Sequence, residues 1–295
     1  MQSGYKNYYE VSSRYTIDLL FNAYGKLYSK KLMVRRLLLV ANWKMNLNVS
    51  QASIYVHRLQ ERTRAHRNLE IVLAPSMLAL QPISTQIDRR KIRLAAQNAY
   101  HKDEGAFTGE VSFSMLRELV HYVIVGHSER RIYFNEDLAM IREKVAAAIR
   151  NDISPILCVG ETQQERREGQ TRQVLHDQVT TALSNLTSDE IARVVIAYEP
   201  VWAISTFGGQ LAKPDEAATA IAFIRHQVRE LYGVKVAERL RVLYGGSVNS
   251  SIIGGYLAAE GCNGALIGGA SLNPYGFADI IEAAYVYQHQ MDETS

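Results

Sequence analysis

The 295-residue sequence has only two cysteines, six prolines and no long apolar run. Cys158 and Cys262 cannot form a disulfide framework and do not have the short spacing of metal ligands, so we expect buried free thiols, a reducing compartment and no bound metal. No apolar run approaches the roughly 18–20 residues that span a bilayer, so we expect no membrane partner.

The chain also lacks a strong charge of either sign. Its formal net charge is +3, and residues 1–32 alone carry five basic and two acidic residues. The rest of the chain is therefore neutral overall, which is not the strongly basic surface that binds a phosphate backbone. We expect no nucleic-acid partner.

Residues 1–32 differ in character from the rest and contain six of the seventeen tyrosines. They show little periodicity and no glycine or proline cluster. Three interpretations stay open: a poorly ordered extension, a targeting segment, or a short helix over 15–28 that docks on the body or a partner. The acidic residues and the missing apolar core do not favour a targeting segment. We treat 1–32 as an N-terminal extension of a single domain, 33–295.

From residue 33 onward, short apolar runs alternate with longer amphipathic segments. The runs that predict strands are 37–42, 70–74, 92–97, 121–126, 154–159, 193–198, 241–244 and 263–267. Helical spacing fills the intervals, for example over 137–145 and 216–232, and a closing helix is expected over 276–290. This count and length predict an α/β fold, a (β/α)₈ barrel. The alternative, a doubly wound open sheet, normally has a Gly-x-Gly-x-x-Gly turn after its first strand, where this chain has Asn42-Trp43-Lys44.

Polar residues and glycines follow five of the predicted strands. They are Asn42 and Lys44, then His127, Ser128 and Glu129, then Glu199, then Gly245, Gly246 and Ser247, and finally Gly268, Gly269 and Ala270. In a barrel these strand ends share one rim, where a carboxylate, an imidazole and an ammonium can together abstract a proton beside a carbonyl. The glycine turns expose backbone N–H groups that suit a phosphate. Each residue alone has a structural explanation, but their convergence favours a catalytic pocket.

Seven multi-residue motifs occur in this order, at 41–46, 105–110, 126–131, 158–161, 197–204, 244–249 and 268–271. Among them are Gly126-His127-Ser128-Glu129-Arg130-Arg131 and Tyr198-Glu199-Pro200-Val201-Trp202. From about residue 37 to its end the chain resembles the triosephosphate isomerase family. The resemblance implies a TIM barrel and a cytoplasmic isomerase of glycolysis and gluconeogenesis. It would interconvert dihydroxyacetone phosphate and D-glyceraldehyde 3-phosphate with no metal or organic cofactor.

The resemblance also implies a role for each catalytic residue. Glu199 is similar to the general base and His127 to the neutral electrophile, a pairing for which triosephosphate isomerase is itself the known example. Lys44 resembles the cation that neutralises the enediolate and the phosphate, and Asn42 the residue that polarises the carbonyl. Glu129 would hold Lys44 through a charge-assisted hydrogen bond.

The same resemblance places the substrate phosphate near Ser205, Ser247, Gly268 and Gly269. It also implies a homodimer, because the family's loop corresponding to 105–110 reaches into a neighbouring subunit. There its threonine, here Thr108, braces the partner's catalytic asparagine and histidine.

The lid that follows Glu199 departs from the family pattern. Residues 205–213 make it about two residues longer, and Ser205 stands where the family has a glycine. If that glycine uses a positive φ, serine adopts the closed conformation less readily. We expect an active isomerase with an altered lid. The alternatives are a related isomerase of larger phosphosugars and a non-catalytic barrel that serves as a binding or scaffold protein.

Overall fold

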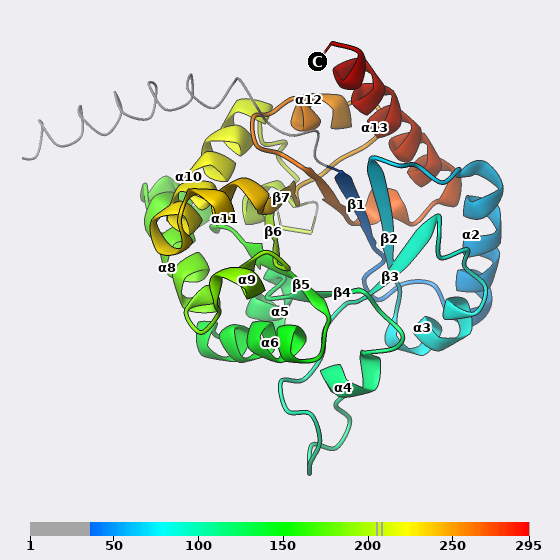
Figure 1. Ribbon diagram of the computed structural model, residues 1–295, viewed down its shortest axis with the longest axis horizontal. Helices are drawn as coiled ribbons and strands as arrows, with labels where there is room; N and C mark the ends of the chain where they lie inside the picture. Colours follow the sequence, from blue (N-terminus) through cyan, green and yellow to red (C-terminus); the bar gives the residue numbers. More distant parts are fainter. Residues whose placement is uncertain (1–35, 205, 208, 295) are drawn as a thin grey trace, which may run out of the picture. The chain divides into compact units, whose positions relative to one another are not determined.

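A computed structural model of the chain describes residues 36–204, 206–207 and 209–294. Eight parallel strands pair in sequence order, and the eighth pairs with the first to close a barrel. Figure 1 shows the strands around the centre with the helices outside them. The strands are β1 (Leu37–Asn42), β2 (Leu69–Ala74), β3 (Ile92–Ala96), β4 (Tyr122–Val125), β5 (Ser154–Val159), β6 (Val195–Tyr198), β7 (Arg241–Tyr244) and β8 (Gly264–Ile267). The predicted (β/α)₈ barrel is confirmed, and the doubly wound open sheet is excluded.

All eight predicted strands are present, with small differences at their ends. The run predicted from residue 193 begins as β6 only at Val195. The backbone N–H groups of Arg193 and Val194 donate instead to the carbonyls of Glu190 and Ile191, at 3.0 Å each. These turn hydrogen bonds compete with the strand ladder, a local effect that apolar patterning does not predict.

Twelve α-helices are described between and after the strands. They are α2 (Val49–Arg62), α3 (Met77–Ser84), α4 (Phe113–Leu116), α5 (Ser128–Tyr133), α6 (Leu138–Arg150), α7 (Gln163–Arg167), α8 (Thr171–Leu183), α9 (Ser188–Ile191), α10 (Pro214–Tyr232), α11 (Val234–Arg239), α12 (Ile253–Leu257) and α13 (Pro274–Thr294). Two short 3₁₀ helices, η2 (Val201–Ala203) and η3 (Gly269–Ser271), follow β6 and β8. None of these helices is long and apolar enough to cross a membrane.

The strands read as nearly continuous apolar runs because both of their faces are buried. On β1, Leu38 and Val40 belong to a cluster inside the barrel, whereas Leu39 and Ala41 belong to the larger core beneath the helices. Burial on both faces is the expected environment of a parallel sheet. Cys158 and Cys262 are both free and buried, as predicted.

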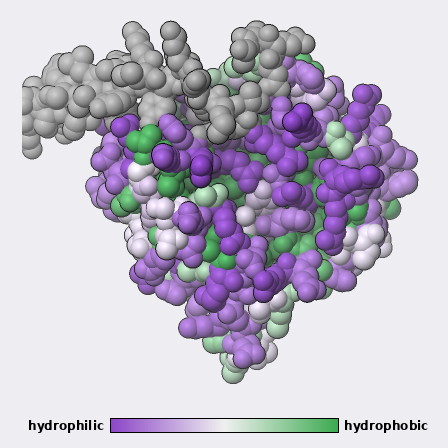
Figure 2. Space-filling model, viewed as in Figure 1, coloured by the Kyte–Doolittle hydropathy of each residue, from purple (hydrophilic) through white to green (hydrophobic). Residues whose placement is uncertain are grey.

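Sequence signals also explain where the helices begin. The side chain of Asp137 accepts a hydrogen bond from the backbone of Met140 and caps α6, and Pro214 opens α10. On the face seen in Figure 2 polar residues predominate, with apolar ones in smaller areas between them. The loop between β3 and α4 projects away from the barrel in Figure 1.

Candidate active site

A pocket of about 320 Å³ lies at the carboxyl ends of the strands. It is lined by Asn42, Lys44, His127, Glu199, Ile204, Gly245, Gly246, Ser247, Val248, Leu266, Gly268, Gly269 and Ala270. The barrel thus gathers the predicted residues of five strand ends in one place. Three residues of the predicted site are not part of this lining. Glu129 contacts the ammonium of Lys44, Thr108 is exposed on the projecting loop, and Ser205 lies outside the described residues.

Glu199 directly follows β6, and its side chain is buried. Its backbone N–H donates to the Val159 carbonyl at 2.7 Å, which continues the strand pairing into the loop. One carboxylate oxygen, Oε2, accepts from the backbone N–H of Ser128 at 3.1 Å, and the other, Oε1, lies 3.2 Å from Nε2 of His127. Neighbouring strand ends therefore orient the carboxylate.

The proton of a neutral His127 ring is placed by the helix that follows. His127 precedes α5, and its Nδ1 accepts a hydrogen bond from the backbone N–H of Glu129 at 3.2 Å. An accepting ring nitrogen carries no proton, so the single proton of a neutral ring is on Nε2. That nitrogen faces Glu199, so His127 can donate a hydrogen bond within the pocket.

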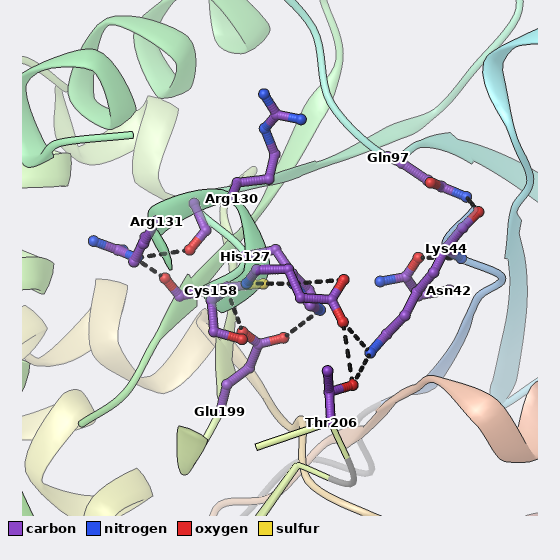
Figure 3. A network of polar contacts seen from close by, with 12 residues as sticks. Asn42, Lys44, Gln97, His127, Arg130, Arg131, Cys158, Glu199 and Thr206 are labelled. Carbon is purple, nitrogen blue, oxygen red and sulfur yellow. Dashed lines mark hydrogen bonds and ion pairs between the residues drawn. The ribbon is translucent and has the colours of Figure 1, made fainter. Parts of the chain in front are cut away.

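Lys44 is held in an unusual backbone conformation, with a φ of +52°. Its N–H donates to Oδ1 of Asn42 at 3.0 Å, and its carbonyl accepts from Nε2 of Gln97 at 2.8 Å. Its ammonium lies 2.6 Å from Oε1 of Glu129. Figure 3 shows the Lys44 side chain pointing toward Thr206. Such strain at a non-glycine residue persists only where surrounding contacts fix it.

The sequence reasoning missed the part that Gln97 plays. Besides binding the Lys44 carbonyl, Gln97 donates to the carbonyl of Ala74 at 2.9 Å and so joins the loop after β1 to the end of β2. The signal was available, because Gln97 is the last residue of the predicted third strand and the strand-end argument applies to it equally.

Arg131 was also missed as a positioning residue. It lies within the 126–131 motif, and it donates to the carbonyls of Gly126 at 2.7 Å and Cys158 at 2.9 Å. The guanidinium thereby ties the ends of β4 and β5 together close to Glu199. Burial lowers the pKa of Arg131. Burial, and to a smaller extent the nearby Glu199 carboxylate, raises the pKa of the Cys158 thiol well above its usual range, which keeps that thiol neutral.

A third missed residue, Glu161, anchors the segment that leads from Glu199 into the lid. Its carboxylate has no exposed surface and accepts from Nε1 of Trp202 at 2.9 Å and from the Tyr198 hydroxyl at 3.2 Å. Burial raises the pKa of Glu161 despite these hydrogen bonds. The Arg166 guanidinium lies 3.8 Å above the Trp202 ring. The 158–161 motif supports the family resemblance, but the motif did not predict the contacts of Glu161 with Trp202 and Tyr198.

Two described lid residues contact groups beside the pocket. The Thr206 hydroxyl lies 3.4 Å from Oε1 of Glu129 and 3.5 Å from Nζ of Lys44. Phe207 is half-buried, and its ring centroid lies 5.7 Å from that of Tyr133 on α5. The ring thus packs beside α5 instead of standing fully in solvent.

The glycine-rich side of the pocket combines Ser247 with the turn before η3. The Ser247 hydroxyl donates to the Ala203 carbonyl at 3.0 Å, which links the loop after β7 to η2. Gly268 and Gly269 line the pocket where η3 begins. Backbone N–H groups at a helix start have no partner within the helix and are suited to an anion.

Comparison with known proteins agrees with this geometry. The sequence profile described as triosephosphate isomerase matches residues 37–284. The chain is 40% identical over 257 residues to the triosephosphate isomerase of Dehalococcoides mccartyi strain BAV1, covering 87% of this chain and all of that protein. It is 43% identical over 253 residues to that of Chloroherpeton thalassium, covering 85% of this chain and all of that protein. The matched residues include every strand of the barrel and the described pocket, and the chain therefore belongs to the triosephosphate isomerase family.

Proposed function

We propose that the protein interconverts dihydroxyacetone phosphate and D-glyceraldehyde 3-phosphate. The observation that carries this proposal is the meeting of Glu199, His127 and Lys44 in one pocket, with Glu199 Oε1 3.2 Å from His127 Nε2. A base, a neutral hydrogen-bond donor and a cation are the groups needed to form and stabilise an enediolate.

In the proposed mechanism, Glu199 takes a proton from C1 of dihydroxyacetone phosphate. The electron pair of the broken C–H bond forms the C1–C2 double bond, and negative charge moves to the carbonyl oxygen. Nε2–H of His127 donates to the enediolate oxygens, and the Lys44 ammonium offsets their charge. The protonated Glu199 then returns the proton to C2, and transfer of the hydroxyl proton from O1 to O2 completes the aldehyde.

Asn42, Glu129 and the glycine turns position the reactants. The Asn42 side chain lines the pocket and polarises the carbonyl, and Glu129 holds the Lys44 ammonium. Backbone N–H groups near Ser247, Gly268 and Gly269 bind the phosphate. Ser205 is proposed to join them when the longer lid closes. Thr206 supports a lid role, because its hydroxyl reaches the Lys44–Glu129 pair.

The proposal is tested by measuring isomerisation of glyceraldehyde 3-phosphate by the purified full-length protein. Glu199→Gln preserves the size of the side chain and removes the base, so kcat should fall by about 10²–10⁴-fold. Longer phosphosugars serve as competing substrates. Faster turnover of a longer phosphosugar would favour the isomerase of larger substrates, and no turnover of either would favour the scaffold protein.

We further propose that the enzyme acts as a homodimer. Thr108 is exposed on the projecting loop, and two large apolar side chains that follow β1 and β2 in the chain are also exposed: Met45 by 96% and Leu78 by 82%. Large exposed apolar groups are typical of protein interfaces. Sedimentation of the full chain should give twice the chain mass of 33.2 kDa. A monomer that retains full activity would contradict this proposal.

We place the enzyme in the cytoplasm, which the two free cysteines support.

A further inference from the structure

The end of the barrel opposite the active site carries an unusual layer of charged side chains. Side chains alternate along a strand, so a residue two positions before one that points into the barrel also points into the barrel. At this level the inward positions hold Glu70, Arg93, Tyr122, Ser154 and Arg241. The strand registers Tyr122↔Ser154 and Val195↔Arg241 agree with this alternation.

One buried carboxylate in this layer faces two guanidinium groups. Glu70 is 5% exposed, and it lies 2.9 Å from Arg93 and 3.0 Å from Arg241. It also accepts from the Tyr122 hydroxyl at 2.8 Å. Glu70 is therefore fully engaged, and the layer keeps an excess of positive charge.

Beside this layer lies a second pocket, of about 390 Å³. It is lined by Arg89, Arg93, Arg117, Glu118, Val120, His121, Tyr122, Asp152, Ser154 and Arg193. Four arginines thus face two carboxylates. Asp152 is shared between Arg117 and Arg193. Arg89 has no ion-pair partner among the described residues, so its guanidinium is available to a ligand.

His121 reports the positive potential of this pocket. Burial lowers its pKa, and Arg93 and Arg89 lower it further. Its Nδ1 is buried without a hydrogen-bond partner in the described part of the chain. A polar atom of this kind at the wall of a pocket is costly unless a ligand or water satisfies it.

We propose that this second pocket binds a small, multivalent, phosphate-bearing anion at a site separate from the catalytic pocket. Guanidinium groups match the oxygens of a phosphate with paired hydrogen bonds, and several that line one pocket can surround one phosphate. The volume is that of a small-molecule site, which favours a compact ligand over a macromolecule. The site lies at the amino ends of β3 to β5, whereas the catalytic residues lie at the carboxyl ends.

The test measures binding of inorganic pyrophosphate to the full-length protein by calorimetry at fixed ionic strength. A Lys44→Met background weakens anion binding at the catalytic pocket, so that the signal reports the second site. Arg89→Gln should weaken binding by about tenfold, the effect of one lost charge-assisted hydrogen bond. Arg90→Gln is the matched control: this neighbouring arginine is 87% exposed, pairs with Asp88 and does not line the pocket.

Two further measurements locate the site. Pyrophosphate should shift the ring resonances of His121, assigned with His121→Gln, and with Lys44 intact Arg89→Gln should leave the kcat and KM for triose phosphate unchanged. Citrate tests for a preference for phosphate and should bind more weakly. Equal losses in Arg89→Gln and Arg90→Gln, no binding of pyrophosphate, or equal binding of citrate would each overturn the proposal.

Discussion

At the level of single residues, Glu199 depends on space that two glycines leave open. A Cβ at Gly160 would lie 1.8 Å from the Glu199 carbonyl oxygen, and one at Gly245 would lie 2.7 Å from its Cγ. Gly245→Ala should therefore displace Glu199, the proposed base, while the barrel still folds. Because a misplacement of about 1 Å can cost roughly 10²-fold, we expect kcat to fall by 10- to 100-fold in steady-state assays.

The control for this prediction is Gly254→Ala, in α12. An added Cβ there meets no atom within 4 Å, and the residue has no positive φ. Its activity should equal that of the unmodified protein, and its stability should be equal or slightly higher. Full kcat in Gly245→Ala would show that the carboxylate position does not depend on this glycine.

At the level of elements, η2 is joined to the barrel by the hydrogen bond from Trp202 to Glu161. Trp202→Phe leaves the buried carboxylate with only the Tyr198 hydroxyl as a side-chain donor. We expect the free energy of unfolding to fall by about 1–3 kcal/mol, the cost of a buried acceptor that loses its partner. Urea unfolding at one protein concentration measures this, since the proposed dimerisation would make stability depend on concentration.

Glu161→Gln is the comparison at this site, because its amide oxygen can still accept from Trp202. Burial raises the pKa of Glu161 in the folded protein, so this group makes folding less favourable as pH rises above its unfolded pKa. Glu161→Gln removes that dependence and should lose less stability than Trp202→Phe near pH 7. A larger loss of stability in Glu161→Gln than in Trp202→Phe would show that the negative charge on Glu161 matters more than its hydrogen bond with Trp202.

At the level of the whole molecule, the charged layer at the amino end of the barrel makes the free energy of unfolding depend on pH in the acidic range. Burial alone would raise the pKa of Glu70, but Arg241, Tyr122 and Arg93 together hold it below the ordinary 4.5. A depressed carboxyl pKa contributes stability above the unfolded pKa, and this contribution is lost as pH falls through the folded pKa. The barrel should therefore lose stability below about pH 4.5.

Glu70→Gln tests this dependence by thermal unfolding at pH 7 and at low pH. At pH 7 it should cost about 1.5–3 kcal/mol, because two guanidinium groups lose a charged partner. The difference in stability between Glu70→Gln and the unmodified protein should become smaller as the pH is lowered. Glu238→Gln, at an exposed carboxylate with no ion pair among the described residues, should leave the profile unchanged. Parallel pH profiles for Glu70→Gln and the unmodified protein would contradict the assignment.

The sequence by itself determined the barrel and most of the predicted residues that meet in its pocket. Short apolar runs buried on both faces mark parallel strands, and eight of them with intervening helices leave few other arrangements. Glu199, His127 and Lys44 each lie within two residues of the end of a strand, so local sequence order places them at one rim. The order of the seven motifs indicates the family without any information on tertiary contacts.

Only the tertiary structure decided which side chains touch across strands. Gln97 donates a hydrogen bond to the Lys44 carbonyl, and Glu161 accepts one from the Trp202 ring. The charged layer and the arginine-lined pocket beside it bring together residues from β2 to β7. These contacts depend on strand register and on closure of the barrel, which bring positions far apart in sequence within hydrogen-bonding distance. Local apolar patterning carries no information about that register, whereas the position of a residue at the end of its own strand is a local property.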